Sequence, residues 1–110
     1  MPSKQNPLSA QAIEAAELLG ARIQLARRER RWTLQELADR IGVTAVTMRK
    51  VERGDPSVRL GIAFEAAALT GVALFDPEPS RRRLEAERVR DRLALLPRLV
   101  RRPVEVDDDF

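Results

Sequence analysis

The side chains of this chain that can do chemistry are carboxylates, lysines, serines and, above all, arginines. The 110 residues include 20 Lys and Arg and 17 Asp and Glu, but neither histidine nor cysteine. Disulfides, thiol nucleophiles, imidazole bases and most zinc sites are therefore excluded. The remaining groups form no catalytic constellation, cofactor motif or cluster of metal ligands. We therefore expect neither an enzyme nor a bound cofactor or metal.

The positive charge of the chain is unevenly distributed. Residues 81–106 hold nine arginines against four acidic residues, and residues 31–60 hold six basic against four acidic residues. The sign reverses at the C-terminus, in Asp107 to Asp109. Excess positive charge attracts the phosphates of a nucleic acid. The alternative is that arginine-rich helices only keep a small protein in solution.

The middle of the chain predicts two short helices joined by a tight turn. Thr33 can cap the first helix, and Glu36 can reach back to the Thr33 amide, which makes a capping box. Gly42 occupies the place of a left-handed residue that ends a helix. Thr44 can cap the second helix and Gly54 can end it. These are the dimensions of a helix-turn-helix.

Apolar spacing and breakers along the whole chain predict an all-α fold of five helices. The expected helices cover residues 10–30, 34–41, 45–53, 60–70 and 80–96. Ser9 can cap the first of them and Ser80 can start the last. We expect four segments: a flexible tail (1–9), a helix-turn-helix domain (10–76), a C-terminal helix for packing or dimerisation (77–97) and a flexible basic then acidic tail (98–110).

The expected core is aliphatic because aromatic residues make up only 4% of the chain. Helical spacing points the following residues inward: Leu19, Ile23, Ala26, Leu34, Leu37, Ala38, Ile41, Met48 and Val51, with Val46 or Thr47. Trp32 is expected between the first two helices. A short helical turn over residues 72–75 is expected to place Leu74 and Phe75 against the bottom of the core.

Two apolar stripes exceed what this core needs. Ala15, Leu18 and Leu25 either widen the core or contact a second subunit. Along the last helix, apolar residues follow an a/d-like spacing of about two heptads, which is too short for a stable coiled coil by itself. The residues of this second stripe, which must pack on something, are Ala86, Val89, Leu93 and Leu96.

The helix-turn-helix segment resembles the Cro/lambda-repressor (XRE-type) DNA-binding family over residues 18 to 76. The resemblance is carried by Leu19-Gly20-Ala21-Arg22-Ile23, Thr33-Leu34-Gln35-Glu36-Leu37-Ala38, Gly42-Val43-Thr44 and Glu52-Arg53-Gly54. It implies a lambda-repressor-like domain whose second helix enters the major groove of a palindromic operator, with half-sites about one helical turn apart.

The family positions, carried over one at a time, imply two sets of DNA contacts. The residues implied to contact bases are Thr44, Ala45, Val46, Thr47 and Lys50. Lys50 can donate to guanine, and the short apolar groups can touch thymine methyls. The residues implied to contact phosphates are Gln35, Arg40, Arg49 and Arg53. The chain departs from many relatives in lacking glutamines at the reading positions. Glu52 is implied to be a structural hydrogen-bonding residue.

The C-terminal tail suggests a protein partner. Asp107, Asp108 and Asp109 could steer the tail toward a basic surface, and Phe110 could provide a buried anchor. Size and layout resemble HipB-type antitoxins, which implies a HipA-like kinase toxin as a partner. The alternative is a tail that only aids solubility.

Together these features predict a homodimeric, sequence-specific DNA-binding repressor, cytoplasmic and associated with the nucleoid. The favoured subclass is an autoregulating antitoxin. No long apolar run or export signal occurs, and no membrane partner is expected. The alternative function is a helix-turn-helix-fold interaction module that does not read DNA, because Ala45 and Val46 are short and apolar.

Overall fold

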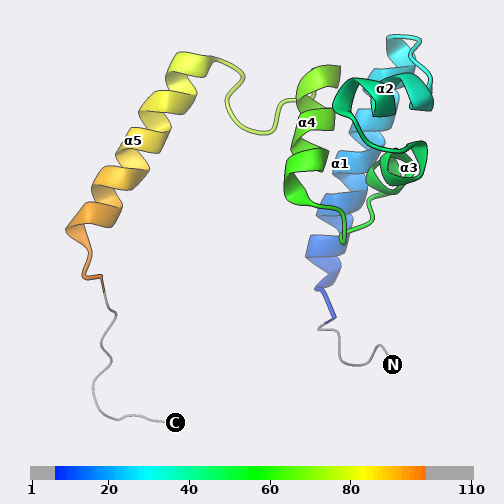
Figure 1. The fold of residues 1–110 in the computed structure, drawn as a ribbon. Coiled ribbons are helices and arrows are strands. Elements are labelled where there is room, and N and C mark those ends of the chain that lie inside the picture. Colours follow the sequence, from blue (N-terminus) through cyan, green and yellow to red (C-terminus); the bar gives the residue numbers. More distant parts are fainter. Residues whose placement is uncertain (1–6, 99–110) are drawn as a thin grey trace. The chain divides into compact units, whose positions relative to one another are not determined.

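The computed structural model describes residues 7–98 and contains five helices in that range (Figure 1). The helices are α1 (Ala10–Glu29), α2 (Leu34–Ile41), α3 (Ala45–Arg53), α4 (Leu60–Thr70) and α5 (Pro79–Leu95). No strand occurs within the described residues. The all-α prediction is confirmed. The chain divides into two compact units, with α1 to α4 in the first and α5 in the second.

The predicted helix ends are set by local hydrogen bonds. Ser9 accepts a hydrogen bond from the Ala12 amide at 3.1 Å and so caps α1. Thr33 and Glu36 form the predicted capping box. The Glu36 amide donates to the Thr33 hydroxyl at 3.0 Å, and the Thr33 amide donates to the Glu36 carboxylate at 2.8 Å. Each cap satisfies amides that the first turn of a helix leaves without partners.

The turn between α2 and α3 depends on one glycine. Gly42 has a φ of 89°, a left-handed conformation that most side chains disfavour. Thr44 then caps α3 by accepting from the Thr47 amide at 3.1 Å. At the end of α1, Arg31 has a φ of 61°, a left-handed conformation that is unusual for a residue other than glycine.

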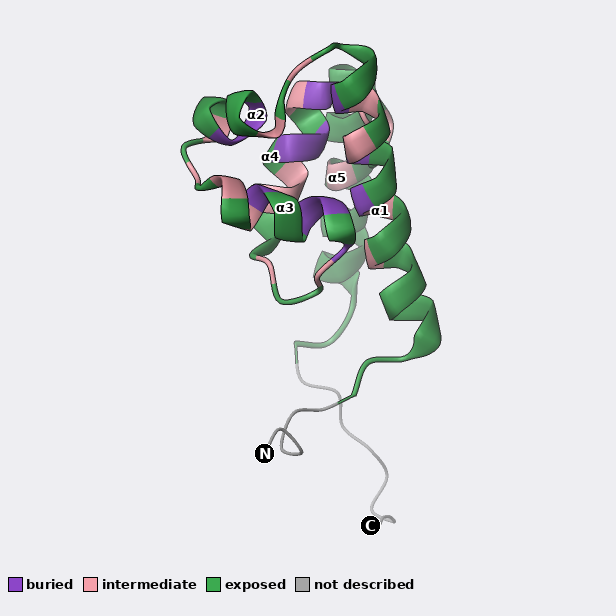
Figure 2. Ribbon diagram, turned by 90° about the vertical axis from the view of Figure 1, so that its right-hand side faces the viewer, coloured by how far each residue is buried: buried purple, intermediate pink, exposed green. Residues whose placement is uncertain are grey.

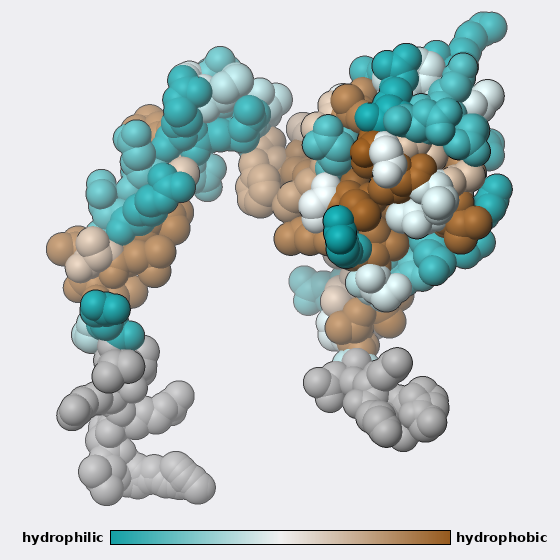
Figure 3. Space-filling view, in the orientation of Figure 1, coloured by the Kyte–Doolittle hydropathy of each residue, from teal (hydrophilic) through white to brown (hydrophobic). Residues whose placement is uncertain are grey.

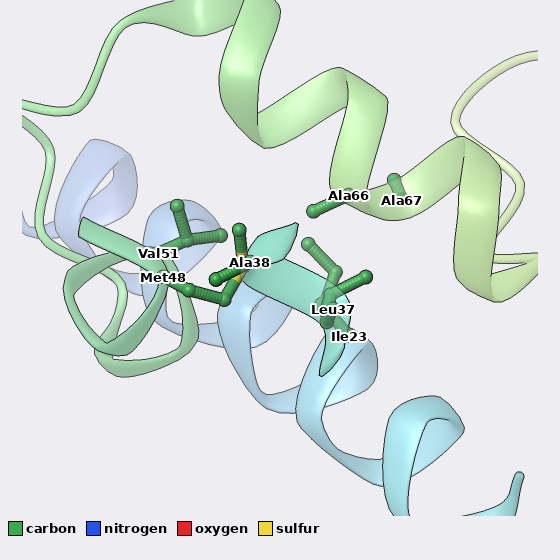
Figure 4. Close-up of a cluster of buried hydrophobic side chains, with 7 residues drawn as sticks. All are labelled: Ile23, Leu37, Ala38, Met48, Val51, Ala66 and Ala67. Atoms are coloured by element: carbon green, nitrogen blue, oxygen red, sulfur yellow. The ribbon is translucent and has the colours of Figure 1, made fainter. Parts of the chain in front are cut away.

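Seven buried apolar side chains form the core, and all four helices of the first unit contribute to it (Figures 2 and 4). They are Ile23, Leu37, Ala38, Met48, Val51, Ala66 and Ala67. Partly buried side chains pack around them, Leu19, Leu34, Ile41 and Trp32 among them. Trp32 also lies against two guanidinium groups, with Arg40 4.2 Å and Arg30 5.7 Å from the ring centre.

Helices α1 and α3 approach each other backbone to backbone. A Cβ atom at Gly20 would lie 2.5 Å from the Val51 carbonyl oxygen, and one at Gly54 would lie 2.5 Å from the Glu17 Cα. The absence of side chains at these two positions therefore sets the distance at which α3 rests on α1.

Two predictions about residues 72–75 were wrong. Residues 72–75 form no helical turn, and Leu74 and Phe75 are 38% and 68% exposed. Gly71, with a φ of 82°, ends α4, and the Val72 amide donates back to Ala67 at 2.8 Å. Val72 thus takes the place against the core that was predicted for its neighbours.

The first apolar stripe does not widen the core, which was one of the two alternatives left open for it. Leu18 and Leu25 are 53% and 59% exposed on α1, and Ala15 is exposed as well.

Helix α5 starts at Pro79 rather than Ser80, because the Glu78 carboxylate caps it by accepting from the Ser80 amide at 3.0 Å. Proline at the first helical position has no amide to leave unsatisfied.

Candidate nucleic-acid interface

Helix α3 has a buried side and an outward side. Met48, Val51 and Glu52 are buried against the other helices, whereas Val46 is 59% exposed and Lys50 is also exposed. Of the two residues predicted to share the inner contacts, Thr47 is half-buried and Val46 faces outward. The outward side therefore presents one apolar and one cationic side chain from successive turns.

A surface hollow of about 470 Å³ lies beside this outward side. Thr44, Thr47 and Lys50, three of the predicted base-contacting residues, all line it. The Thr44 hydroxyl, besides capping α3, lies 3.2 Å from the Thr47 hydroxyl. Ser57 and Arg59 from the connection to α4 add polar and cationic groups to the lining of the hollow. The sequence reasoning missed both, although a basic residue just before a predicted helix was a usable signal for Arg59.

The connection that follows α3 is held in shape by Asp55. Its carboxylate accepts hydrogen bonds from the Ser57 hydroxyl at 2.7 Å and the Ser57 amide at 2.8 Å. These bonds, with a smaller contribution from the charges of Lys50 and Arg53, lower the pKa of Asp55 below its usual value. An ionised Asp55 thus fixes the loop that carries Ser57 beside the reading helix.

A second hollow, of about 270 Å³, lies at the other edge of α3 and is basic. Arg49 and Arg53, both predicted to contact phosphates, line it together with Arg27 and Arg28 of α1. Glu52, Gln24 and Leu34 complete the lining. The sequence reasoning missed Arg28, which is one of many arginines in the chain and becomes notable only when α1 is placed beside α3.

A buried ion pair forms the back of this second hollow. Arg27 Nε donates to Glu52 Oε2 at 2.6 Å and Arg27 Nη2 donates to Glu52 Oε1 at 3.0 Å. The third guanidinium nitrogen, Nη1, donates to the Trp32 carbonyl at 2.8 Å. The hydrogen bonds to Glu52 raise the pKa of Arg27 above its usual value, so the guanidinium stays charged. It ties α3 to α1 and to the loop before α2.

Glu52 therefore has the structural role that the family resemblance implied, and sequence reasoning missed its partner. Arg27 and Glu52 are 25 residues apart, and they retain only 8% and 7% of their exposure. No local pattern marks such a pair. An arginine at an otherwise inward position of α1 was the only available signal.

The two remaining phosphate candidates lie on α2 and line neither hollow. Gln35 donates to Asp39 at 2.8 Å, and Arg40 stacks on Trp32. The proposed docking residues, Asp107 to Phe110, fall outside the described residues. Residues 7–98 contain no cluster of candidate metal ligands, and none of their helices is long and apolar enough to cross a membrane.

Comparison with known proteins places this arrangement in a family. The family model of the helix-turn-helix domain matches residues 18–75, more than half of the chain. Neither a curated protein nor a solved structure gives a significant match. The matched range begins in α1 and ends after α4, so it includes the core, both hollows and the ion pair behind α3. The chain belongs to the helix-turn-helix domain family.

Proposed function

We propose that this protein is a sequence-specific DNA-binding transcriptional repressor of the Cro/lambda-repressor type. The observation that carries the proposal is the outward side of α3, which lies between a hollow lined by Lys50 and Arg59 and a hollow lined by Arg28, Arg49 and Arg53. A reading helix needs side chains that reach base edges, flanked by cations that bind the two backbones of the groove.

We assign each predicted contact a role in DNA binding. Thr44, Ala45, Val46, Thr47 and Lys50 are proposed to meet bases. Lys50 donates to guanine, and the exposed Val46 side chain touches a thymine methyl. Gln35, Arg40, Arg49 and Arg53 are proposed to meet phosphates, and we add Arg28 and Arg59. Helix-turn-helix domains act through binding, and the proposal contains no catalytic step.

The role of Lys50 is tested against that of Arg53. Lys50→Ala should cost about 1–3 kcal/mol of binding free energy on the specific site only, because it removes a donor to a base edge. Arg53→Ala should weaken binding to all duplexes and reduce the slope of log affinity against log salt by about one. Fluorescence anisotropy on a selected operator and a random duplex, over a range of salt, measures both effects.

The control for this experiment is Arg22→Ala, which removes an exposed charge from α1 outside both hollows. It should change neither the specificity ratio nor the slope appreciably. Equal loss on both duplexes for Lys50→Ala would remove this residue from the base-reading set. No retarded complex with any duplex would instead favour an interaction module that does not read DNA.

Within this function, we propose that the protein acts as a homodimer on a palindromic operator, represses its own gene and serves as the antitoxin of a HipA-like kinase toxin. The acidic stretch Asp107 to Asp109 and the terminal Phe110 support the antitoxin role, because they offer charges and an apolar anchor to a partner.

Deleting residues 104–110 should abolish recovery of the kinase in a pull-down from the native host and leave DNA affinity equal or slightly higher. Recovery of the same partners with the full-length and the truncated protein would contradict the docking role.

A further inference from the structure

Helix α5 and Leu96, which directly follows it, carry an apolar stripe that the described residues of their own unit do not cover. Val89, Leu93 and Leu96 are 51%, 62% and 61% exposed, and none of the residues of α5 is buried. Figure 3 shows hydrophobic side chains gathered toward the C-terminal half of this helix. A helix of 17 residues is marginal in water unless an apolar side packs on a partner. The stripe thus requires an occupant.

The stripe forms the floor of a shallow groove with charged edges. Phe75, Ala86, Val89 and Leu93 supply apolar surface to a hollow of about 480 Å³. Its other lining residues are Glu85, Arg82 and Arg90. Along the helix, Glu85 precedes Ala86 and Arg90 follows Val89, so these opposite charges flank the stripe on its two sides. An occupant that presents the same pattern would meet each charge with its opposite.

We propose that the occupant is a second copy of this chain, and that the two α5 helices pack in parallel along this stripe as one contact within a dimer. In heptad terms Ala86 and Leu93 take a positions and Val89 takes the d position between them, which puts Glu85 at g and Arg90 at e. Leu96, directly after the last helical turn, extends the apolar surface beyond the helix. In a parallel pair, a g residue meets the e residue five positions later on the partner. Glu85 of each copy therefore meets Arg90 of the other, twice by symmetry.

The charges also select the direction of pairing. In an antiparallel pair, e positions face e positions, so Arg83 and Arg90 would oppose each other. The g residues Glu85 and Arg92 would also face each other, but the repulsion between the arginines would offset this attraction. The parallel pair has no such repulsion, because the residue five positions after the g residue Arg92 is Pro97, which carries no charge and lies beyond the end of α5. Arg82, at the preceding d position, donates to the carbonyls of Asp76 and Pro77 at 3.0 and 2.9 Å and marks the N-terminal limit of the seam.

This inference rests on the homodimer proposed above, but not on DNA recognition, and it is tested without DNA. Sedimentation equilibrium of the full chain should show a dimer. Val89→Asp should raise its dissociation constant by about 100-fold or more, because a carboxylate would be buried in each half of the seam. Leu18→Asp, on the exposed stripe of α1, is the matched control and should leave the dimer intact. Loss of DNA binding by a chain that still forms the α5 dimer would contradict only the proposed function.

The direction of pairing is tested by disulfide formation, which is clean because the chain has no cysteine. Ala86→Cys places one thiol at an a position, where parallel helices bring the two copies together, and it should form a covalent dimer rapidly under mild oxidation. Arg88→Cys, on the opposite side of α5, should not. A monomeric parent chain, dissociation by Leu18→Asp instead of Val89→Asp, or equal cross-linking of the two cysteine variants would each overturn the proposal.

Discussion

Glu52→Ala is expected to destabilise the first unit by about 3–5 kcal/mol, because it leaves the buried guanidinium of Arg27 without its counter-charge. The two side chains are only 10% and 5% exposed in the parent chain, so the pair is largely shielded from water. A domain of this size has only about 5–15 kcal/mol of stability to lose. Urea denaturation followed by circular dichroism measures the change, and the midpoint should shift without a change in slope.

The double variant Arg27→Met with Glu52→Leu separates the charge from the packing. It removes both ions at similar volume, so it should lie closer to the parent in stability than either single truncation does. The Trp32 carbonyl loses a donor in this variant, so some destabilisation remains. A free energy of unfolding for Glu52→Ala within about 1 kcal/mol of the parent value would show that the pair is solvated and does not hold α3 on α1.

The helices could be predicted from sequence because their ends are set by bonds of short range. Thr33 and Glu36 are three residues apart, and so are Thr44 and the amide that it caps. Gly42 and Gly54 were identifiable because left-handed backbone strongly favours glycine. Each of these capping residues and glycines lies within one helical turn of the helix end that it sets.

The rest of the site depends on how the helices meet. Arg27 finds Glu52 across 25 residues of sequence, and Arg28 joins Arg49 and Arg53 only because α1 crosses α3. A periodic pattern shows that a face is apolar, but it does not show what covers that face. For this reason Leu18 was left between two alternatives, and Phe75 was wrongly placed on the core of the first unit.

Gly20→Ala is expected to destabilise the first unit by about 1–3 kcal/mol, although alanine favours a helix over glycine by about 0.5–1 kcal/mol. The added Cβ would lie 2.5 Å from the Val51 carbonyl oxygen and 2.6 Å from that of Glu52. Backbone atoms cannot rotate away as a flexible side chain can, so α3 itself must shift. That shift would also strain the hydrogen bonds of Glu52 to Arg27, which bind the same two helices.

Gly61→Ala provides the control, because no atom lies within 4 Å of a Cβ at that position of α4 and its φ is not left-handed. There alanine should stabilise by up to about 0.5–1 kcal/mol. Opposite signs for the two substitutions, measured as unfolding midpoints, would locate the cost at the crossing of α1 and α3 rather than in helix propensity. Equal stabilisation by both substitutions would mean that α1 and α3 lie far enough apart in solution to accommodate a methyl group at position 20.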